Sequence, residues 1–277
     1  MVSQIPQEIC PRPFLKWAGG KSRLIQQYIP YLPKKYKTYY EPFIGGGAVF
    51  FYLKPQTAVL TDINAELITT YRCVRDRVEE LISLLKEHKN QHSREYYYTV
   101  RSNPQGTDLE KAARLIYLNK TCFNGLYRVN SKGQFNVPIG RYKNPNICDE
   151  GLLRTASAAL AHTKIKQADF LEVLNYETNS DDFVFCDPPY YPISSTSYFT
   201  SYSQSSFDKE DQERLRDTCA KLADRGVKVM ICNSDCDFIR KLYKEINFNI
   251  YPIEASRSIN SNTKKRGMIY EVLITSY

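Results

Sequence analysis

The 277-residue chain, with 42% hydrophobic and 25% charged residues, holds enough apolar material for a sizeable core, which excludes a mainly disordered protein. Its net charge of +8 indicates only a mild preference for anionic partners. Its eight cysteines include no Cys-x-x-Cys pair, and no apolar window is long enough to span a membrane. We therefore expect a reduced, cytoplasmic protein with no metal site, no disulfide framework and no membrane partner.

The first part of the chain has a β-α-β pattern. Residues 38–41 and 57–61 predict strands, and residues 48–53 predict a helix between them. The glycines at 45–47 predict the turn that joins the first strand to the helix. Asp62 closes the second strand.

The middle of the chain predicts helices. Helical spacing resumes over residues 64–75 and continues through most of residues 76–160. Residues 127–139 interrupt it as a predicted β-hairpin with Ser131-Lys132-Gly133 as its turn. Two apolar helix faces support this prediction: Val78, Leu81, Ile82 and Leu85, and Leu109, Ala112, Ala113 and Ile116.

Strands and helices alternate again in the last part of the chain. The pattern as a whole predicts an α/β fold with a doubly wound sheet and a mostly helical insert that carries the hairpin. We expect one domain made of residues 1–75 and 161–277, and an insert made of residues 76–160. The predicted late strands are residues 164–166, 183–186, 227–232, 248–253 and 268–275, with a helix at 208–224.

Basic residues gather in three stretches that hold no acidic residue. Residues 10–40 hold seven lysines and arginines, residues 120–143 hold five, and residues 256–267 hold four. If these stretches meet in space they form a positive face, for which nucleic acid is the favoured partner. Three unrelated solvated loops are the alternative.

The glycine turn at 45–47 and Asp62 indicate a cofactor site. Glycines let a ligand approach the backbone, and a carboxylate at the end of the second strand can accept hydrogen bonds from a ribose. The spacing suits an adenosine-containing cofactor, but the turn lacks the Gly-x-Gly-x-x-Gly pattern and no phosphate-binding lysine follows it. A plain strand-to-helix turn therefore remains an alternative.

A more specific pattern is Asp187-Pro188-Pro189-Tyr190, which follows an apolar strand and so lies where open α/β sheets bind ligands. The amine of an aromatic base is a poor nucleophile because its lone pair is delocalised into the ring. Asp187 can accept a hydrogen bond from one N–H group of this amine, and the Pro188 carbonyl can accept one from the other. Both acceptors favour the positive charge that develops on the nitrogen. Tyr190 offers a ring for stacking. A polar turn that ends a strand is the alternative.

Together with Phe43-Ile44-Gly45-Gly46-Gly47 and Phe14-Leu15-Lys16-Trp17-Ala18-Gly19-Gly20-Lys21, this tetrapeptide resembles the Dam-type adenine-N6 DNA methyltransferases of the D12 class. The resemblance covers nearly the whole chain and keeps the family's order of cofactor half, target-recognition insert and catalytic motif. It implies a Rossmann-like methyltransferase sheet, S-adenosylmethionine as cofactor, double-stranded DNA as partner and flipping of the target base.

The resemblance also assigns residues to the cofactor and to catalysis. Asp169 and Phe170 would bracket the adenine of the cofactor. The implied catalytic residues are Asp187, Pro188 and Tyr190. The implied cofactor contacts are Trp17, Lys21, Glu41, Phe43, Gly45, Gly47, Asp62, Asp169, Phe170 and Asp187.

The implied recognition residues lie mainly in the hairpin. Arg128 would read a guanine in the major groove, Lys16 would contact the first guanine, and Phe123 would fill the gap left by the flipped adenine. These roles imply recognition of GATC. The implied DNA contacts are Lys16, Phe123, Asn124, Leu126, Arg128, Pro138 and Arg257.

Several expectations concern the remaining segments. Residues 192–206, uncharged and rich in serine and tyrosine, are interpreted as a lid over the target adenine, with local disorder as the alternative. Residues 256–267 would follow the DNA backbone. His88 and His92 lie on a polar helical run and are expected to be solvated.

We expect a monomer. Methylation of another GAT-containing site or of RNA, and a non-catalytic module that only holds the cofactor, are the alternatives.

Overall fold

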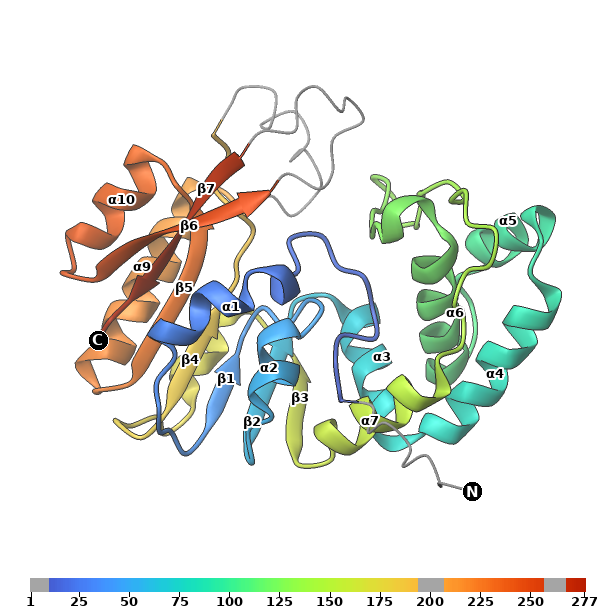
Figure 1. Ribbon diagram of the computed structural model, residues 1–277, viewed down its shortest axis with the longest axis horizontal. Helices are drawn as coiled ribbons and strands as arrows, with labels where there is room; N and C mark the ends of the chain where they lie inside the picture. The colour runs from blue at the N-terminus through green and yellow to red at the C-terminus, as the bar shows by residue number, and fades with distance from the viewer. Residues whose placement is uncertain (1–9, 194–206, 257–267) are drawn as a thin grey trace, which may run out of the picture. The chain divides into compact units, whose positions relative to one another are not determined.

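A seven-stranded sheet forms the frame of the computed structural model, which describes residues 10–193, 207–256 and 268–277 (Figure 1). Its strands are β1 (Tyr39–Glu41), β2 (Ala58–Asp62), β3 (Thr163–Gln167), β4 (Phe183–Cys186), β5 (Lys228–Ser234), β6 (Asn249–Ser256) and β7 (Met268–Thr275). Their order is β3-β2-β1-β4-β5-β7-β6. Strands β1, β2, β4 and β5 pair in parallel, and β7 is antiparallel to β5 and β6. The predicted α/β class is confirmed.

The strand order reverses between β1 and β4. From β1 the chain steps outward to β2 and β3, then returns to β4 on the other side of β1. The parallel register pairs Tyr40 with Val184, so the carboxyl ends of the two strands lie side by side. In open α/β sheets, ligands bind at such a reversal, outside the carboxyl ends of the strands. The segments that follow β1 and β4 therefore lie where a ligand-binding site is expected.

The described chain divides into two compact units. The sheet unit contains residues 21–44, 55–63 and 166–277, and the helical unit contains the chain up to residue 20 with residues 45–54 and 64–165. Strand β3 begins in the helical unit and ends in the sheet unit.

The core of the sheet unit lies between its strands and helices α9 (Lys209–Asp224) and α10 (Asp237–Lys244) (Figure 1). Every residue of β4 is buried, as expected of a central strand in a parallel sheet. A capping box between Asp208 and Asp211 begins α9 and satisfies backbone N–H groups of its first turn. Short helices complete the unit: η1 (Lys21–Arg23), α1 (Ile25–Tyr28), η2 (Ile29–Tyr31) and η4 (Phe170–Asn175).

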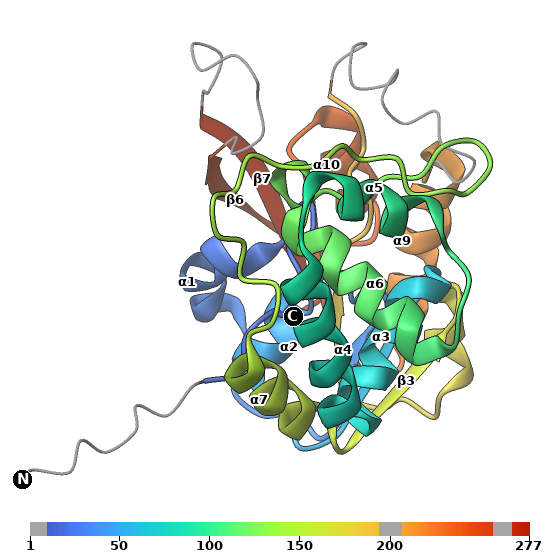
Figure 2. The same ribbon diagram turned by 90° about the vertical axis from the view of Figure 1, so that its right-hand side faces the viewer.

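The helical unit contains the whole of the predicted insert (Figure 2). Its central helix, α6, buries Leu109, Ala112, Ala113 and Ile116, which confirms that predicted apolar face. On α4, Leu81, Ile82 and Leu85 are buried and Val78 is half-buried. The helices are α2 (Ala48–Leu53), α3 (Ala65–Asp76), α4 (Val78–Gln91), α5 (Arg94–Ser102), α6 (Asp108–Thr121), η3 (Phe123–Gly125) and α7 (Glu150–Leu160).

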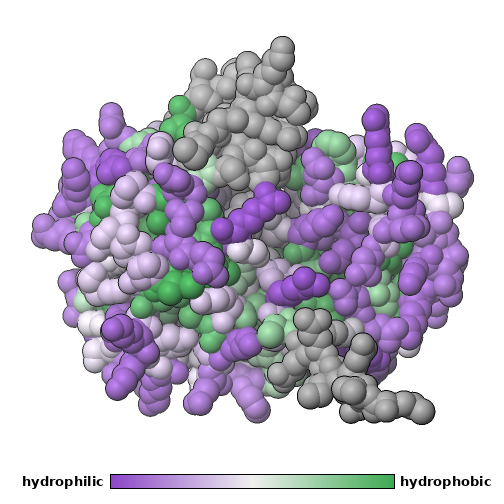
Figure 3. All heavy atoms as spheres, in the orientation of Figure 1, coloured by the Kyte–Doolittle hydropathy of each residue, from purple (hydrophilic) through white to green (hydrophobic). Residues whose placement is uncertain are grey.

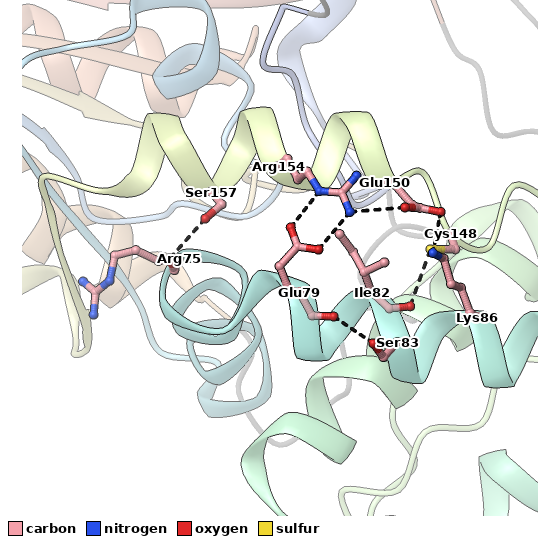
Figure 4. A network of polar contacts seen from close by, with 9 residues as sticks. All are labelled: Arg75, Glu79, Ile82, Ser83, Lys86, Cys148, Glu150, Arg154 and Ser157. Atoms are coloured by element: carbon pink, nitrogen blue, oxygen red, sulfur yellow. Dashed lines mark hydrogen bonds and ion pairs between the residues drawn. The ribbon is translucent and has the colours of Figure 1, made fainter.

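A polar network ties α7 to α3 and α4 (Figure 4). The Arg154 guanidinium donates two hydrogen bonds to the Glu79 carboxylate, at 2.7 and 2.8 Å, and a third to Glu150 at 3.3 Å. The Ser157 hydroxyl donates to the Arg75 carbonyl at 3.1 Å. Because these ion pairs are exposed to solvent, they add little net stability, and the buried apolar faces carry most of it.

The predicted hairpin is present, but its two arms pair through isolated bridges and a few backbone hydrogen bonds rather than as regular strands. Val129 faces Phe135, and Cys122 faces Ile139 beyond the predicted range. The turn is held by the Asn130 side chain, whose Oδ1 accepts hydrogen bonds from the Lys132 and Gln134 N–H groups, each at 3.0 Å. Side-chain bonds therefore hold the turn, while the Asn136 N–H donates to the Arg128 carbonyl across the arms at 3.0 Å.

The expectation that His88 and His92 are solvated is wrong. His88 Nδ1 lies 2.8 Å from the Tyr96 hydroxyl, and His92 Nδ1 lies 2.9 Å from the Tyr117 hydroxyl. Burial lowers the pKa of both imidazoles. The helical run is polar in sequence, but α5 and α6 bring tyrosine rings against it. The residue pattern of one helix does not show which side chains of other helices pack on it.

Hydrophilic residues cover most of the described surface on the face seen in Figure 3. None of the helices that the structure describes is long and apolar enough to cross a membrane. All eight cysteines lie in the described segments and are free thiols.

Candidate active site

Three carboxylates stand at the carboxyl ends of neighbouring strands in the sheet unit. Glu41 is the last residue of β1, Asp62 is the last residue of β2, and Asp187 directly follows β4. Glu41 is buried and accepts a hydrogen bond from the Tyr39 hydroxyl at 2.8 Å. The sheet topology thus places Glu41 and Asp187 at the reversal between β1 and β4, with Asp62 one strand further along the same carboxyl edge.

Asp187 forms an ion pair with Lys21. The Lys21 side chain is almost fully buried, and its Nζ lies 2.9 Å from Asp187 Oδ1. Burial raises the pKa of Asp187 to about 6, although the ammonium of Lys21 lowers it, and the Glu271 carboxylate adds to the rise. Burial lowers the pKa of Lys21, but Asp187, Cys232 and Glu271 together outweigh this and the net shift is upward. At neutral pH, Asp187 is therefore an anion held next to a cation.

Tyr190 lies over the same lysine. Lys21 Nζ is 4.6 Å from the centroid of the Tyr190 ring, within the range of a cation–π contact. The Tyr190 hydroxyl donates a hydrogen bond to Glu271 Oε2 at 2.7 Å. Burial raises the pKa of Tyr190 well above its ordinary value, so the hydroxyl stays a donor.

Buried polar side chains fix the backbone that follows Asp187. The Gln212 side chain donates to the Pro189 carbonyl at 2.9 Å, and the Asn233 side chain donates to Gln212 at 2.9 Å. Asn233 Oδ1 also accepts from the Tyr191 N–H at 3.1 Å. By contrast, the Pro188 carbonyl accepts no hydrogen bond from any residue that the structure describes. The backbone directly after this available acceptor is thus fixed at Pro189 and Tyr191.

An aromatic cluster lies in the same unit. The rings of Phe43 and Phe170 stack with centroids 5.6 Å apart, and Phe207 contacts both. A purine between two parallel rings needs about 7 Å, so an adenine at this cluster would lie against an outer face or edge of the pair. Asp169 accepts the Leu171 N–H at 3.0 Å and lies 3.8 Å from the Arg214 guanidinium.

In the helical unit, Trp17 packs against the glycine turn. A Cβ added at Gly45, whose φ is +45°, would lie only 2.9 Å from Trp17 Cδ1. Gly47 has a φ of 67° and precedes α2 in a left-handed conformation that favours glycine. On its other side, Trp17 stacks on Tyr127 at 5.2 Å. The sequence requirement for glycine here comes from the backbone conformation and from the indole.

Asn119 joins the segment around Lys16 to the end of α6. Its side chain accepts the Lys16 N–H at 2.8 Å and donates to the carbonyls of Lys16 and Gly125 at 2.7 and 3.0 Å. A Cβ on Gly125 would lie 2.5 Å from Lys16 Cδ, so only glycine permits this approach. The Lys16 ammonium is exposed and lies 4.6 Å from the centroid of the Tyr142 ring.

The hairpin presents its predicted DNA contacts on the surface of the helical unit. Phe123 is 47% exposed, although it is a large aromatic residue at the end of a buried helix. Its N–H donates to the Pro138 carbonyl at 2.9 Å, which joins the two arms. Asn124, Arg128 and Pro138 are exposed, and Leu126 is half-buried. Arg128 Nε donates to Asn136 Oδ1 at 2.7 Å.

The predicted site residues divide between the two units of the fold. Lys21, Asp187 and Tyr190 meet in the sheet unit, where Phe43 and Phe170 also meet. Lys16, Trp17, Gly45, Gly47 and the hairpin belong to the helical unit. Arg257 and the segments 194–206 and 257–267 lie outside the described residues.

The sequence did not indicate Glu271, Gln212 or Asn233. Glu271 reaches the site because β7 returns antiparallel and pairs it with Ser234 at the end of β5. A lone carboxylate in the otherwise apolar run 268–275 was the available signal. Asn233 and Ser234 at the end of β5 were another, because they follow the apolar run at 229–232.

No cluster of three metal-ligating side chains occurs among residues 10–193, 207–256 and 268–277. The groups assembled at the strand ends are instead a carboxylate, a main-chain carbonyl and an aromatic ring. They suit a planar ligand with an amine to be bound.

Comparisons with known proteins agree with this chemistry. The family model of the D12 class N6 adenine-specific DNA methyltransferases matches residues 17–259. The chain is 47% identical over 274 residues to the type II methyltransferase M1.LlaDCHI of Lactococcus lactis subsp. cremoris, covering 96% of this chain and 95% of that protein. It is 43% identical over 289 residues to the type II methyltransferase M.MjaIII of Methanocaldococcus jannaschii, covering 96% and 99%.

A third relative is the DNA adenine methylase of Escherichia coli K12, which is 35% identical over 264 residues and covered to 92% on both sides. Because the family model spans most of the sequence and each of these relatives is covered nearly end to end, the chain belongs to the D12 class of N6 adenine-specific DNA methyltransferases.

Proposed function

We propose that this enzyme methylates N6 of adenine within GATC in duplex DNA, after flipping that adenine out of the helix. The observation that carries the proposal is the pair of acceptors after β4, namely the Asp187 carboxylate held by Lys21 and the Pro188 carbonyl in a loop fixed by Gln212 and Asn233. An exocyclic amine has two N–H groups, and the pair offers one acceptor to each.

The two acceptors act on the charge of the amine. As the nitrogen forms its new bond, it loses conjugation with the ring and becomes positive. An anionic carboxylate and a carbonyl dipole that are already in place stabilise this change without reorganising. After the bond has formed, the extra proton leaves to solvent. Tyr190 holds the plane of the base during the reaction by stacking.

S-adenosylmethionine is the methyl donor, as the methyltransferase family requires. When bound, it supplies an electrophilic methyl group on a sulfonium. The residues of the sheet unit fit it chemically, because Glu41 and Asp62 offer carboxylates for its ammonium or hydroxyl groups and the cluster of Phe43 and Phe170 offers apolar surface for its adenine. Lys21, Asp169 and Asp187 complete the proposed set there. Trp17, Gly45 and Gly47 are the proposed contacts from the helical unit.

Recognition of the duplex is assigned to the helical unit. Arg128 has the exposed guanidinium that a guanine edge requires, and Phe123 is the exposed ring that can enter the base stack. Lys16, Asn124, Leu126 and Pro138 are proposed to contact the remaining bases, and Arg257 the backbone. In this proposal residues 76–160 form the target-recognition insert, and residues 1–75 and 161–277 the catalytic domain.

We further propose that the enzyme acts as a cytoplasmic monomer. One chain carries both the acceptor pair and the proposed recognition hairpin, so a single copy has the complete set of groups. Gel filtration of the free protein and of its complex with one duplex tests this, since a second copy in the complex would contradict it.

The experiment that tests the proposed function is expression in a host that lacks adenine methylation, followed by mapping of modified bases in its genomic DNA. We expect N6-methyladenine at GATC. Methylation at a different GAT-containing sequence overturns the specificity, while modification of host RNA instead of DNA, or of neither, overturns the substrate assignment. An unmethylated host carrying Asp187→Ala serves as the control.

A further inference from the structure

The ring of Tyr190 is held at two points. Its hydroxyl donates to Glu271 at 2.7 Å, and one ring face lies 4.6 Å from the ammonium of Lys21. Lys21 is fixed in turn by Asp187 at 2.9 Å. A tyrosine side chain can otherwise swing about its two χ angles, so a bond at the hydroxyl and a contact on one face together define the plane of the ring.

Strand β7 brings Glu271 to this place. The antiparallel register pairs Glu271 with Ser234, the last residue of β5, so the carboxylate stands at the edge of the sheet where the loop after β4 begins. Glu271 is the charged residue of an otherwise apolar strand, which buries Val272, Leu273 and Ile274 in the core. A half-buried carboxylate in such a strand costs stability unless it is hydrogen-bonded, and the Tyr190 hydroxyl donates such a bond to Glu271.

We propose that Glu271 is a positioning residue that fixes the ring of Tyr190, and that the target base stacks on the ring face opposite Lys21. The inference rests on the proposed function, since it assumes a flipped base beside Asp187. Glu271 does not touch the base. It acts through the tyrosine hydroxyl, which a charged acceptor holds more strongly than a neutral one.

The test compares binding of two duplexes that differ only at the target position, one with adenine and one with an abasic site. Kd values are measured with S-adenosylhomocysteine present, so that no turnover occurs. The ratio of the two Kd values reports the contacts of the flipped base. Stacking of a base on an aromatic side chain is commonly worth roughly a tenfold change in Kd or more.

Five variants separate the roles. Glu271→Ala removes the acceptor and Tyr190→Phe removes the donor, and we expect each to reduce the preference for the adenine duplex about tenfold relative to wild type. The double variant should lose no more than either single one. Glu271→Gln keeps an oxygen that can accept the hydroxyl, so it should largely restore the preference. Glu254→Ala, on the exposed surface of neighbouring β6, is the matched control and should leave it unchanged.

The pH dependence gives a second readout that a merely structural role would not move. The Glu271 carboxylate raises the pKa of Asp187. Glu271→Gln should therefore shift the acidic limb of the single-turnover rate to lower pH, while Tyr190→Phe should leave that limb in place. Glu271→Gln should thus keep the preference for the adenine duplex and shift the acidic limb, whereas Tyr190→Phe should lose the preference and keep the limb in place.

A Tyr190→Phe variant with the wild-type preference for the adenine duplex overturns the inference, because phenylalanine keeps the ring and loses only the hydroxyl. This result decides the question even if Glu271→Ala does not fold. Equal losses with both duplexes also overturn it. If the wild-type protein transfers no methyl group to duplex DNA, the proposed function fails instead, and the two failures are distinct.

Discussion

The ammonium of Lys21 lies 2.9 Å from Asp187 Oδ1 at the end of β4, where Lys21 is almost fully buried and Asp187 is partly buried. An ion pair of this kind sets the protonation state of the carboxylate. Burial alone would favour the neutral acid, and the cation restores the anion that an amine substrate needs.

The pH dependence of methyl transfer follows from this pair. With the pKa of Asp187 at about 6, the single-turnover rate should fall as the pH drops below about 6, approaching tenfold per pH unit, because protonated Asp187 no longer offers an anionic acceptor. Lys21→Met removes the charge that lowers this pKa, so the acidic limb should move to higher pH. The measurement is made at saturating cofactor, because Lys21 is also a proposed cofactor contact.

Lys221→Met is the control for that experiment, since Lys221 is exposed on α9 and should leave the limb unchanged. An acidic limb that stays in place in the Lys21 variant would show that another group controls the reaction.

Arg128 should determine specificity rather than general affinity. Arg128→Ala removes the guanidinium proposed to read guanine, so the ratio of Kd values for GATC and altered duplexes should shrink by roughly tenfold to a hundredfold. Lys132→Ala, at the exposed tip of the same hairpin, should instead weaken binding to every duplex alike and reduce the salt dependence. A uniform loss for Arg128→Ala would remove it from base recognition.

Asn119 should be required for the stability of the helical unit. Asn119→Ala removes three hydrogen bonds and leaves buried partners around Lys16 and Gly125 unsatisfied, so the free energy of unfolding should fall by about 1–3 kcal/mol. The measurement is urea unfolding followed by circular dichroism. Asn146→Ala is the matched control because the Asn146 side chain is exposed and donates to Asp149 at 3.2 Å, and its loss should change little.

The helical unit should lose stability in mild acid. Burial lowers the pKa of His88 and His92 below 6.5, so the unfolded chain binds protons at a pH where the folded one does not. The free energy of unfolding is therefore highest above pH 6.5 and falls as the pH drops below 6.5. Melting temperatures at pH 7.5 and 5.5 should differ less for His88→Gln and His92→Gln combined than for wild type. Equal differences would contradict the role of these histidines.

The sequence predicted the parts of the fold that depend on local patterns. The strands at 183–186 and 268–275 and the helix at 48–53 were predicted with their exact bounds, because apolar runs, glycine turns and caps mark them. The turn at 45–47 and the motif at 187–190 were recognisable for the same reason. Helices α1 and α10 were not predicted as elements, since one is a single turn and the other a short amphipathic segment.

The contacts made by side chains distant in sequence could not be predicted. The pairing of Tyr190 with Glu271 depends on the antiparallel return of β7, and the contact of Tyr117 with His92 depends on how α4 and α6 pack. The same is true of the loop fixed by Gln212. Each of these requires the register between elements, which no local spacing encodes.

The most direct measurement of the central claim is the single-turnover rate of N6-methyladenine formation in a GATC duplex by wild type and by Asp187→Asn, with nucleosides quantified by mass spectrometry. Asparagine keeps the size of the side chain and removes the anion, so the rate should be at least about a hundredfold lower with an unchanged melting temperature. A folded Asp187→Asn enzyme that methylates at close to the wild-type rate would contradict it.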